Sequence, residues 1–144
     1  MLLSKKQIHD IAGDLDMGMR CFYHKKTYKI HTILDFDKFP DGDEELWEED
    51  INYIDENFMD MIEFKAMTSR DSFEVMEDFV ESIDDKNLQK RLINALSRRK
   101  PFQNFKIIIE NNWDYRKQWF DFKNQRNFEW VENQVKNLNL NHKN

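Results

Sequence analysis

The amino-acid sequence predicts an α+β fold in which a small antiparallel sheet packs with helices and the C-terminal half is all helical. Apolar residues alternate one by one within residues 18–36 and 58–66, as in strands that bury one face. From residue 71 onward they recur every three or four residues, as in helices. Only three glycines and two prolines occur, too few for an all-β fold rich in tight turns. Because no linker or repeat interrupts the sequence, we expect one domain over residues 1–144.

The N-terminal segment favours a helix followed by a hairpin. A helix is expected over residues 4–15, with Ser4 as its N-cap. Residues 18–36 contain two alternating stretches, rich in β-branched and aromatic residues, on either side of the polar sequence HKKT. They predict a hairpin, but its turn has no Asn-Gly or Asp-Gly pair, so its register stays open. The apolar residues of the helix stripe are Ile8, Ile11, Ala12 and Leu15.

A turn, a helix and a third strand are predicted next. Residues 40–42, with the sequence PDG, are the strongest turn signal in the chain. The acidic stretch that follows predicts a helix, because its acids suit the positive end of the helix dipole. Alternation then resumes and predicts a strand over about residues 58–66. The apolar residues that define the helix stripe and the strand alternation are Leu46, Ile51, Ile54, Phe58, Ile62 and Phe64.

Four helices are predicted in the second half. Asp71, followed three residues later by Glu74, resembles a capping box and is expected to start the first of them. The second covers residues 86–97, and the third starts at Pro101, where a missing N–H has no cost. The fourth runs from about residue 115 to 138. The apolar residues expected on the core stripes are Phe73, Met76, Phe79, Val80, Ile83, Leu88, Leu92, Ala95, Leu96, Phe102, Phe105, Ile108, Ile109, Phe128, Val131, Val135 and Leu138.

Charge is segregated along the chain, although the net charge is only −6. Residues 35–85 carry 20 acidic and three basic residues, whereas residues 86–126 carry 11 basic and three acidic ones. Segments of opposite charge attract one another or steer a charged partner. Two interpretations therefore stay open: the basic helices are neutralised by the chain's own acidic helices, including residues 71–83, or they bind an acidic partner.

The candidate site is the basic, aromatic segment ALSRRKPFQNFKIIIENN at residues 95–112, together with cations that follow it. Its aromatic residues have the spacing of a helix core, so the three adjacent cations of residues 98–100 are the most credible part. Arg91, Lys117 and Phe102 belong to the same basic, aromatic cluster. The predicted partner-binding residues are Arg98, Arg99, Lys100, Lys106, Arg116 and Trp119.

We predict a non-catalytic protein-interaction or regulatory protein, with an acidic protein as the partner of the basic residues. A nucleic-acid-associated accessory protein is the alternative, because cations beside aromatic rings suit single-stranded nucleic acid. The sequence pI of about 5.2 disfavours it. An enzyme of unassigned chemistry is the third interpretation, since no Gly-rich phosphate loop, GxSxG motif or nucleotide fingerprint occurs.

Two chemical alternatives carry little weight. Asp37, Asp41, Gly42 and Glu48 match positions of an EF-hand loop, but Phe39 at its third position offers no side-chain oxygen. An acidic helix start explains the same residues, and we expect no metal and no cofactor. In one register of the hairpin, Cys21 would lie opposite His31, which would place a thiol beside a base. A half-buried strand cysteine is the commoner case.

The sequence also indicates a cytoplasmic protein without a membrane partner. No apolar run approaches the roughly 18–20 residues that span a bilayer. The first ten residues, MLLSKKQIHD, carry charges where a secretory signal needs apolar residues. The single cysteine agrees with a reducing compartment. The sequence makes no prediction of the oligomeric state.

The motifs SFEVMEDFVESI, ALSRRKPFQNFK and WFDF with EW downstream occur in this order within about residues 60–131. In this the chain resembles the bacterial uncharacterised protein family numbered 0158. The resemblance implies a small cytoplasmic α+β protein and supplies no catalytic residue or ligand. The positions of this sequence that match the family's motifs are Met76, Asp78, Phe79, Arg98, Pro101, Phe102, Phe105, Lys106 and Trp119.

Overall fold

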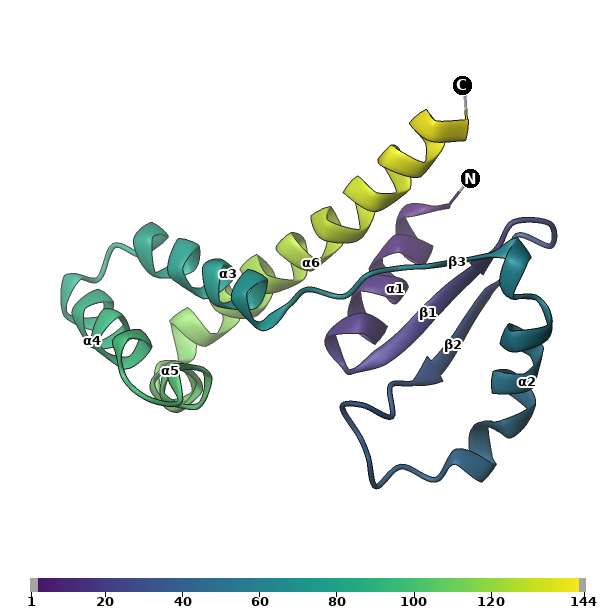
Figure 1. Cartoon of the computed structure of the whole chain (residues 1–144). Coiled ribbons are helices and arrows are strands. Elements are labelled where there is room, and N and C mark those ends of the chain that lie inside the picture. The colour runs from purple at the N-terminus through teal and green to yellow at the C-terminus, as the bar shows by residue number, and fades with distance from the viewer. Residues whose placement is uncertain (1–2, 143–144) are drawn as a thin grey trace. The chain divides into compact units, whose positions relative to one another are not determined.

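The computed structural model describes residues 3–142, with side chains up to residue 138, and it has the predicted α+β class and order of elements (Figure 1). Six α-helices, two short 3₁₀ helices and three strands form the described part of the chain. In chain order they are α1 (Lys5–Asp16), β1 (Met19–His24), β2 (Ile30–Leu34), η1 (Glu44–Trp47), α2 (Glu48–Glu56), η2 (Phe58–Asp60), β3 (Met61–Glu63), α3 (Ser69–Ser82), α4 (Lys86–Ser97), α5 (Pro101–Glu110) and α6 (Trp113–His142).

The chain divides into two compact units. Unit 1 comprises the residues up to Ala66 and those from Asn127 onward, and unit 2 comprises Met67–Arg126. Helix α6 therefore contributes residues to both units. The expected single domain over residues 1–144 stays a prediction.

Unit 1 contains a three-stranded antiparallel sheet in the order β2-β1-β3. The hairpin predicted over residues 18–36 is confirmed, and its register places Cys21 opposite Thr32 and Phe22 opposite His31. The register that would set Cys21 opposite His31 is thus not the one adopted. The sheet alternation decides this pairing, because Cys21 and Phe22 point to opposite faces.

The third strand is shorter than the predicted 58–66, because β3 covers only Met61–Glu63. Residues 58–60 instead form η2, which is closed by a hydrogen bond from the Asp60 N–H to the Asn57 carbonyl at 2.9 Å. The Phe58 side chain is exposed and takes no part in the expected alternation, whereas Phe64 is buried.

The two faces of the sheet bury different clusters within unit 1. Cys21 and Tyr23 on one face pack with α1 and with the unit 1 part of α6, which supplies Val131. Phe22 and other residues of the opposite face pack against α2. The sheet is therefore covered on both sides, and Figure 1 shows α1 and α2 on its opposite faces. The remaining buried residues of the two clusters are Ile8, Ile11, Ala12, Leu15, Phe64, Phe128 and Val135 in the first and Ile33 and Ile54 in the second.

Helix α1 follows its prediction closely. The Ser4 hydroxyl accepts a hydrogen bond from the Gln7 N–H at 3.1 Å, and the Gln7 side chain accepts one from the Ser4 N–H at 2.9 Å. This capping box satisfies two N–H groups that the first turn would otherwise leave unpaired. Gly18, with a φ of 89°, then turns the chain into β1.

The predicted stripe of Leu46, Ile51 and Ile54 is wrong at its first member. Leu46 is 79% exposed, whereas Trp47, Ile51 and Ile54 belong to the cluster beneath α2. The helix that was expected to be continuous starts as the 3₁₀ helix η1, which turns by about 120° per residue instead of 100°. This tighter winding places Trp47 against the sheet and Leu46 in solvent.

Unit 2 begins with α3, whose N-cap is Thr68 and not the predicted Asp71. The Thr68 hydroxyl accepts a hydrogen bond from the Asp71 N–H at 3.1 Å, and an Asp71 carboxylate oxygen accepts one from the Thr68 N–H at 2.9 Å. Asp71 therefore occupies the acidic third position of a capping box that starts one turn earlier. Both Thr68 and Asp71 are residue types that can cap a helix, and the prediction of Asp71 as the N-cap is wrong.

The core of unit 2 lies among α3, α4, α5 and the unit 2 part of α6. Phe105 and Ile109 of α5 are buried in it, as predicted, but Phe102 remains 44% exposed. Phe102 lies in the first turn of α5, at the end that adjoins the link from α4, so its ring is only partly covered. The other buried residues of this core are Met76, Phe79, Val80, Ile83, Leu88 and Leu92.

Candidate functional site

The basic corner, defined as Arg98, Arg99 and Lys100, is a tight link between α4 and α5. Lys100 adopts the left-handed conformation, with φ 56° and ψ 55°. The residue before a proline disfavours the right-handed helical region, which agrees with this break between the helices at Pro101. The Asn104 side-chain amide donates a hydrogen bond to the Arg99 carbonyl at 2.8 Å. The corner backbone is thus held in one conformation from inside α5.

The three cations of the basic corner face solvent. Within the described residues none of them forms an ion pair, so the acidic helix α3 does not neutralise them. Two carboxylates of α3 are paired elsewhere: Asp78 with Arg126 at 2.7 Å and Glu74 with Arg70 at 3.6 Å. The corner therefore presents three unpaired positive charges on a backbone link that is held by the Asn104 hydrogen bond.

A shallow groove of about 310 Å³ lies between α4 and α5 next to the basic corner. Arg91 and Arg98 line it together with Ile107, an apolar residue that is 52% exposed. The remaining lining residues are Asn94, Ala95, Asn104 and Ile108. We call this surface the α4–α5 groove. A mixture of arginine and exposed isoleucine suits an acidic ligand that also carries an apolar side chain.

The structure places the other predicted partner-binding residues outside this groove. Lys106 lies on α5 within 3.9 Å of Glu110, one helical turn away. Arg116 lies on α6, where its guanidinium is 4.8 Å from the Phe120 ring centroid. Trp119 packs in the core of unit 2, with its ring centroid 4.8 Å from that of Phe105. Arg98, Arg99 and Lys100 therefore lie together in the link. Lys106, Arg116 and Trp119 lie elsewhere in unit 2.

Sequence reasoning did not identify Ile107 as part of the site. A signal was present, because Ile107, Ile108 and Ile109 are consecutive, and a helix cannot direct three consecutive side chains toward one core. Ile109 is buried, Ile108 is half-buried, and Ile107 is left on the surface beside Arg98.

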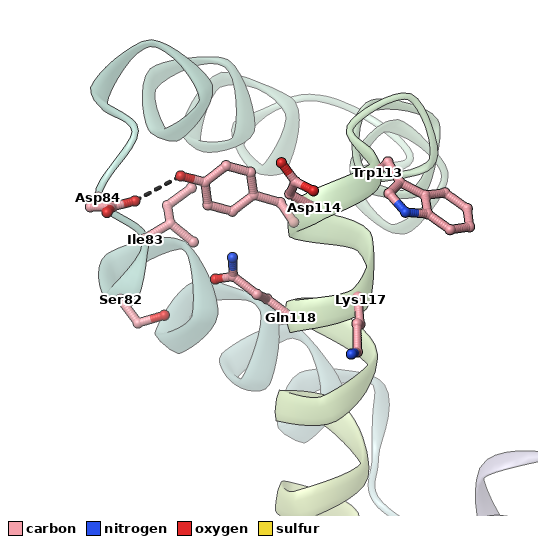
Figure 2. Close-up of a pocket in the computed structure, with 8 residues that line it drawn as sticks. Ser82, Ile83, Asp84, Trp113, Asp114, Lys117 and Gln118 are labelled. Carbon is pink, nitrogen blue, oxygen red and sulfur yellow. Dashed lines mark hydrogen bonds between the residues drawn. The ribbon is translucent and has the colours of Figure 1, made fainter.

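A second hollow in unit 2, of about 620 Å³, lies between the end of α3 and the start of α6 (Figure 2). The Tyr115 hydroxyl donates a hydrogen bond to the Asp84 carboxylate at 2.7 Å, which lowers the pKa of Asp84. A general acid needs the opposite shift, so Asp84 does not support acid–base chemistry at neutral pH. The residues lining this hollow are Ser82, Ile83, Asp84, Trp113, Asp114, Tyr115, Lys117 and Gln118.

The surroundings of Cys21 and the placement of the acidic side chains bear on the cysteine nucleophile and on the metal site. Cys21 is fully buried, and burial raises the pKa of its thiol to about 11, while Thr32 donates a hydrogen bond to the sulfur at 3.9 Å. Because the thiolate is the nucleophile, such a thiol is unreactive at neutral pH. Among the side chains of residues 3–138, no group of three or more His, Cys, Asp or Glu is arranged to hold a metal ion.

The helices that the structure describes include none whose length and apolarity would allow it to cross a membrane.

Comparisons with known proteins place the chain in a family. No solved structure matches it. A UPF0158 protein of Pseudomonas aeruginosa is 30% identical over 65 residues, which cover 45% of this chain and 42% of that relative's length. The chain thus spans less than half of the relative it matches. The model of the uncharacterised protein family UPF0158 matches residues 1–143, a wider range than the residues 60–131 that carry the motifs. The chain therefore belongs to UPF0158, a family of uncharacterised function.

Proposed function

We propose that this chain is a non-catalytic interaction or regulatory protein that binds an acidic protein partner at the α4–α5 groove and basic corner. The observation that carries the proposal is the set of unpaired cations on a fixed helix link, next to the exposed Ile107. An ordered backbone at the link loses little conformational entropy on binding, and the cations set the orientation of an oppositely charged partner. The cytoplasmic location inferred from the sequence belongs to this proposal.

The test uses an acidic peptide as the probe. A fluorescent twelve-residue peptide of glutamate and leucine is expected to bind at low salt, and its affinity should fall as salt rises. Arg98→Glu with Arg99→Glu should weaken binding by about tenfold or more, which corresponds to about 1.4 kcal/mol. Fluorescence anisotropy measures both affinities.

The matched control is Lys5→Glu with Lys6→Glu, an equal change of charge at exposed positions of α1. It should leave peptide binding nearly unchanged. Equal losses in the two double variants would mean that the peptide responds only to net charge, and the proposal would fail.

A nucleic-acid-associated role is the second candidate, and one observation favours it. Arg116 stacks between Trp113 and Phe120, with ring centroids 5.7 Å and 4.8 Å from its guanidinium, and both aromatic rings are exposed. Bases stack on such rings. A single-stranded RNA of 20 nucleotides belongs in the same anisotropy experiment. RNA binding that exceeds peptide binding and is lost in Trp113→Ala would favour this candidate over the first.

A further inference from the structure

Unit 1 carries an acidic surface that complements the α4–α5 groove. It is the segment DEELWEED of residues 43–50, which forms η1 and the first turn of α2 and which we call the acidic segment. Six of its eight residues are carboxylates. Within the described residues none of the six forms an ion pair, so their charge is available to a partner.

The acidic segment also presents an apolar tip. Trp47 packs in the cluster beneath α2 and fixes the segment on the sheet, and the 3₁₀ winding of η1 directs Leu46 away from that cluster. Leu46 is 79% exposed, with Glu45 before it in the sequence and Glu48 two residues after it. A single exposed leucine is common on protein surfaces. Leu46, however, lies in the middle of the acidic segment, which Trp47 anchors to the cluster beneath α2.

The groove in unit 2 has the reverse character. Arg91 and Arg98 line it together with the exposed Ile107, and neither arginine forms an ion pair with a described residue. The acidic segment offers carboxylates around Leu46, so charge and apolar surface match on both sides. Such pairing of a positive patch with a negative patch steers association and fixes the register of an interface.

We infer that the partner of the α4–α5 groove is the acidic segment of a second copy of this chain. The inference rests on the proposed function, because it names the partner of the same groove. Each copy carries both surfaces, so a pair of copies that closes on itself makes two equivalent contacts, the groove of each with the acidic segment of the other. Once the first contact forms, the second is intramolecular and gains from a high effective concentration. A closed dimer with two-fold symmetry is the expected assembly.

The experiment exchanges charge between the two surfaces. Variant A carries Arg91→Glu and Arg98→Glu. Variant B carries Glu44→Arg, Glu45→Arg, Glu48→Arg and Glu49→Arg, because the six carboxylates of the acidic segment require four such changes before its charge becomes positive. Sedimentation velocity of the wild-type chain in 50 mM salt should show a monomer–dimer equilibrium that shifts toward monomer in 500 mM salt. Variants A and B should each be monomeric, because each sets like charges against one another.

An equimolar mixture of A and B should restore the dimer. In the mixed pair, one contact is wild type and the other has its charges exchanged, so both contacts are attractive. A variant that merely failed to fold would not be rescued by mixing. Leu46→Ser, a change at an exposed side chain, should weaken the wild-type dimer by about tenfold, and the Lys5→Glu, Lys6→Glu control should still dimerise.

Three results would overturn this inference: a wild-type chain that stays monomeric at low salt, a mixture of A and B that stays monomeric, or growth beyond a dimer. Its failure is distinguishable from that of the proposed function. A monomeric wild type that still binds the acidic peptide through Arg98 and Arg99 would retain the groove as a site for another acidic protein.

Discussion

At the scale of single residues, the histidines of the hairpin differ in how they are satisfied. The buried His24 accepts hydrogen bonds at Nδ1 from the Lys26 and Thr27 N–H groups, at 3.1 and 3.2 Å, and thereby holds the hairpin turn. The buried Nε2 atom of His31 has no hydrogen-bond partner within the described residues, and its ring packs 4.7 Å from Tyr53. The unpaired Nε2 atom of His31 therefore lowers the stability of the fold, whereas the hydrogen bonds of His24 raise it.

This difference predicts a pH effect at His31. Burial, first, and the nearby His24 and Lys29 lower the pKa of His31 below 6.5, against the opposing charge of Asp50. The unfolded chain then takes up the proton first, so stability is lost as pH falls from 6.5 through the folded pKa. His31→Phe keeps a ring against Tyr53, and we expect it to add about 1 kcal/mol at pH 7 and to flatten this acid loss.

Urea unfolding at pH 7 and pH 5 measures the His31 effect. His9→Phe, at an exposed histidine of α1, is the matched control. A wild-type chain and a His31→Phe variant that lose equal free energy of unfolding between these pH values would contradict the assignment.

At the scale of elements, the sequence predicted a helix well where capping and helix-breaking residues mark its ends. Helix α4 has the predicted bounds, and α1 has its predicted cap. The errors occur where two local choices compete or where packing decides. Thr68 and Asp71 are both competent caps, and the exposure of Leu46 depends on a 3₁₀ turn that no periodicity reveals. The basic corner was visible as adjacent cations, but the groove required α4 and α5 to pack side by side.

The link between α4 and α5 allows stability and binding to be separated. A left-handed conformation costs a residue with a Cβ atom about 1 kcal/mol, and Lys100 bears this cost within the proposed site. Lys100→Gly and Lys100→Ala remove the same charge, but only glycine relieves the strain. We expect the glycine variant to be more stable than the alanine variant by about 1 kcal/mol and both to bind the acidic peptide equally weakly. Equal thermal stabilities of the two variants would contradict the strain assignment.

At the scale of the whole molecule, α6 is the element whose residues serve two cores. Tyr115, Trp119 and Phe122 pack in unit 2, whereas other residues further along α6 pack in unit 1. Helix formation is cooperative along the chain, so loss of one core removes support from a helix that the other core also uses. This shared helix is the physical reason to expect that the two units unfold together as one domain.

This expectation is tested by a cavity-forming substitution in unit 2 and a measurement of unfolding in unit 1. Leu92→Ala removes a fully buried side chain of unit 2 and should lower the free energy of unfolding by about 2–5 kcal/mol. The single thiol, Cys21, is buried in unit 1 and reports on the opening of that unit through its labelling in urea. In a cooperative domain Leu92→Ala shifts the midpoint of Cys21 labelling as far as it shifts the loss of helical circular dichroism.

The control for this test is Ile93→Ala, at the exposed neighbouring position, which should change stability by less than about 0.5 kcal/mol. The reciprocal variant, Ile11→Ala in unit 1, should lower the same common transition, because Ile11 is buried beneath the sheet. Protection of Cys21 that persists to the wild-type urea midpoint in Leu92→Ala, while helical signal is already lost, would show that the units unfold separately. Such a result would replace the single domain with two domains that have α6 in common.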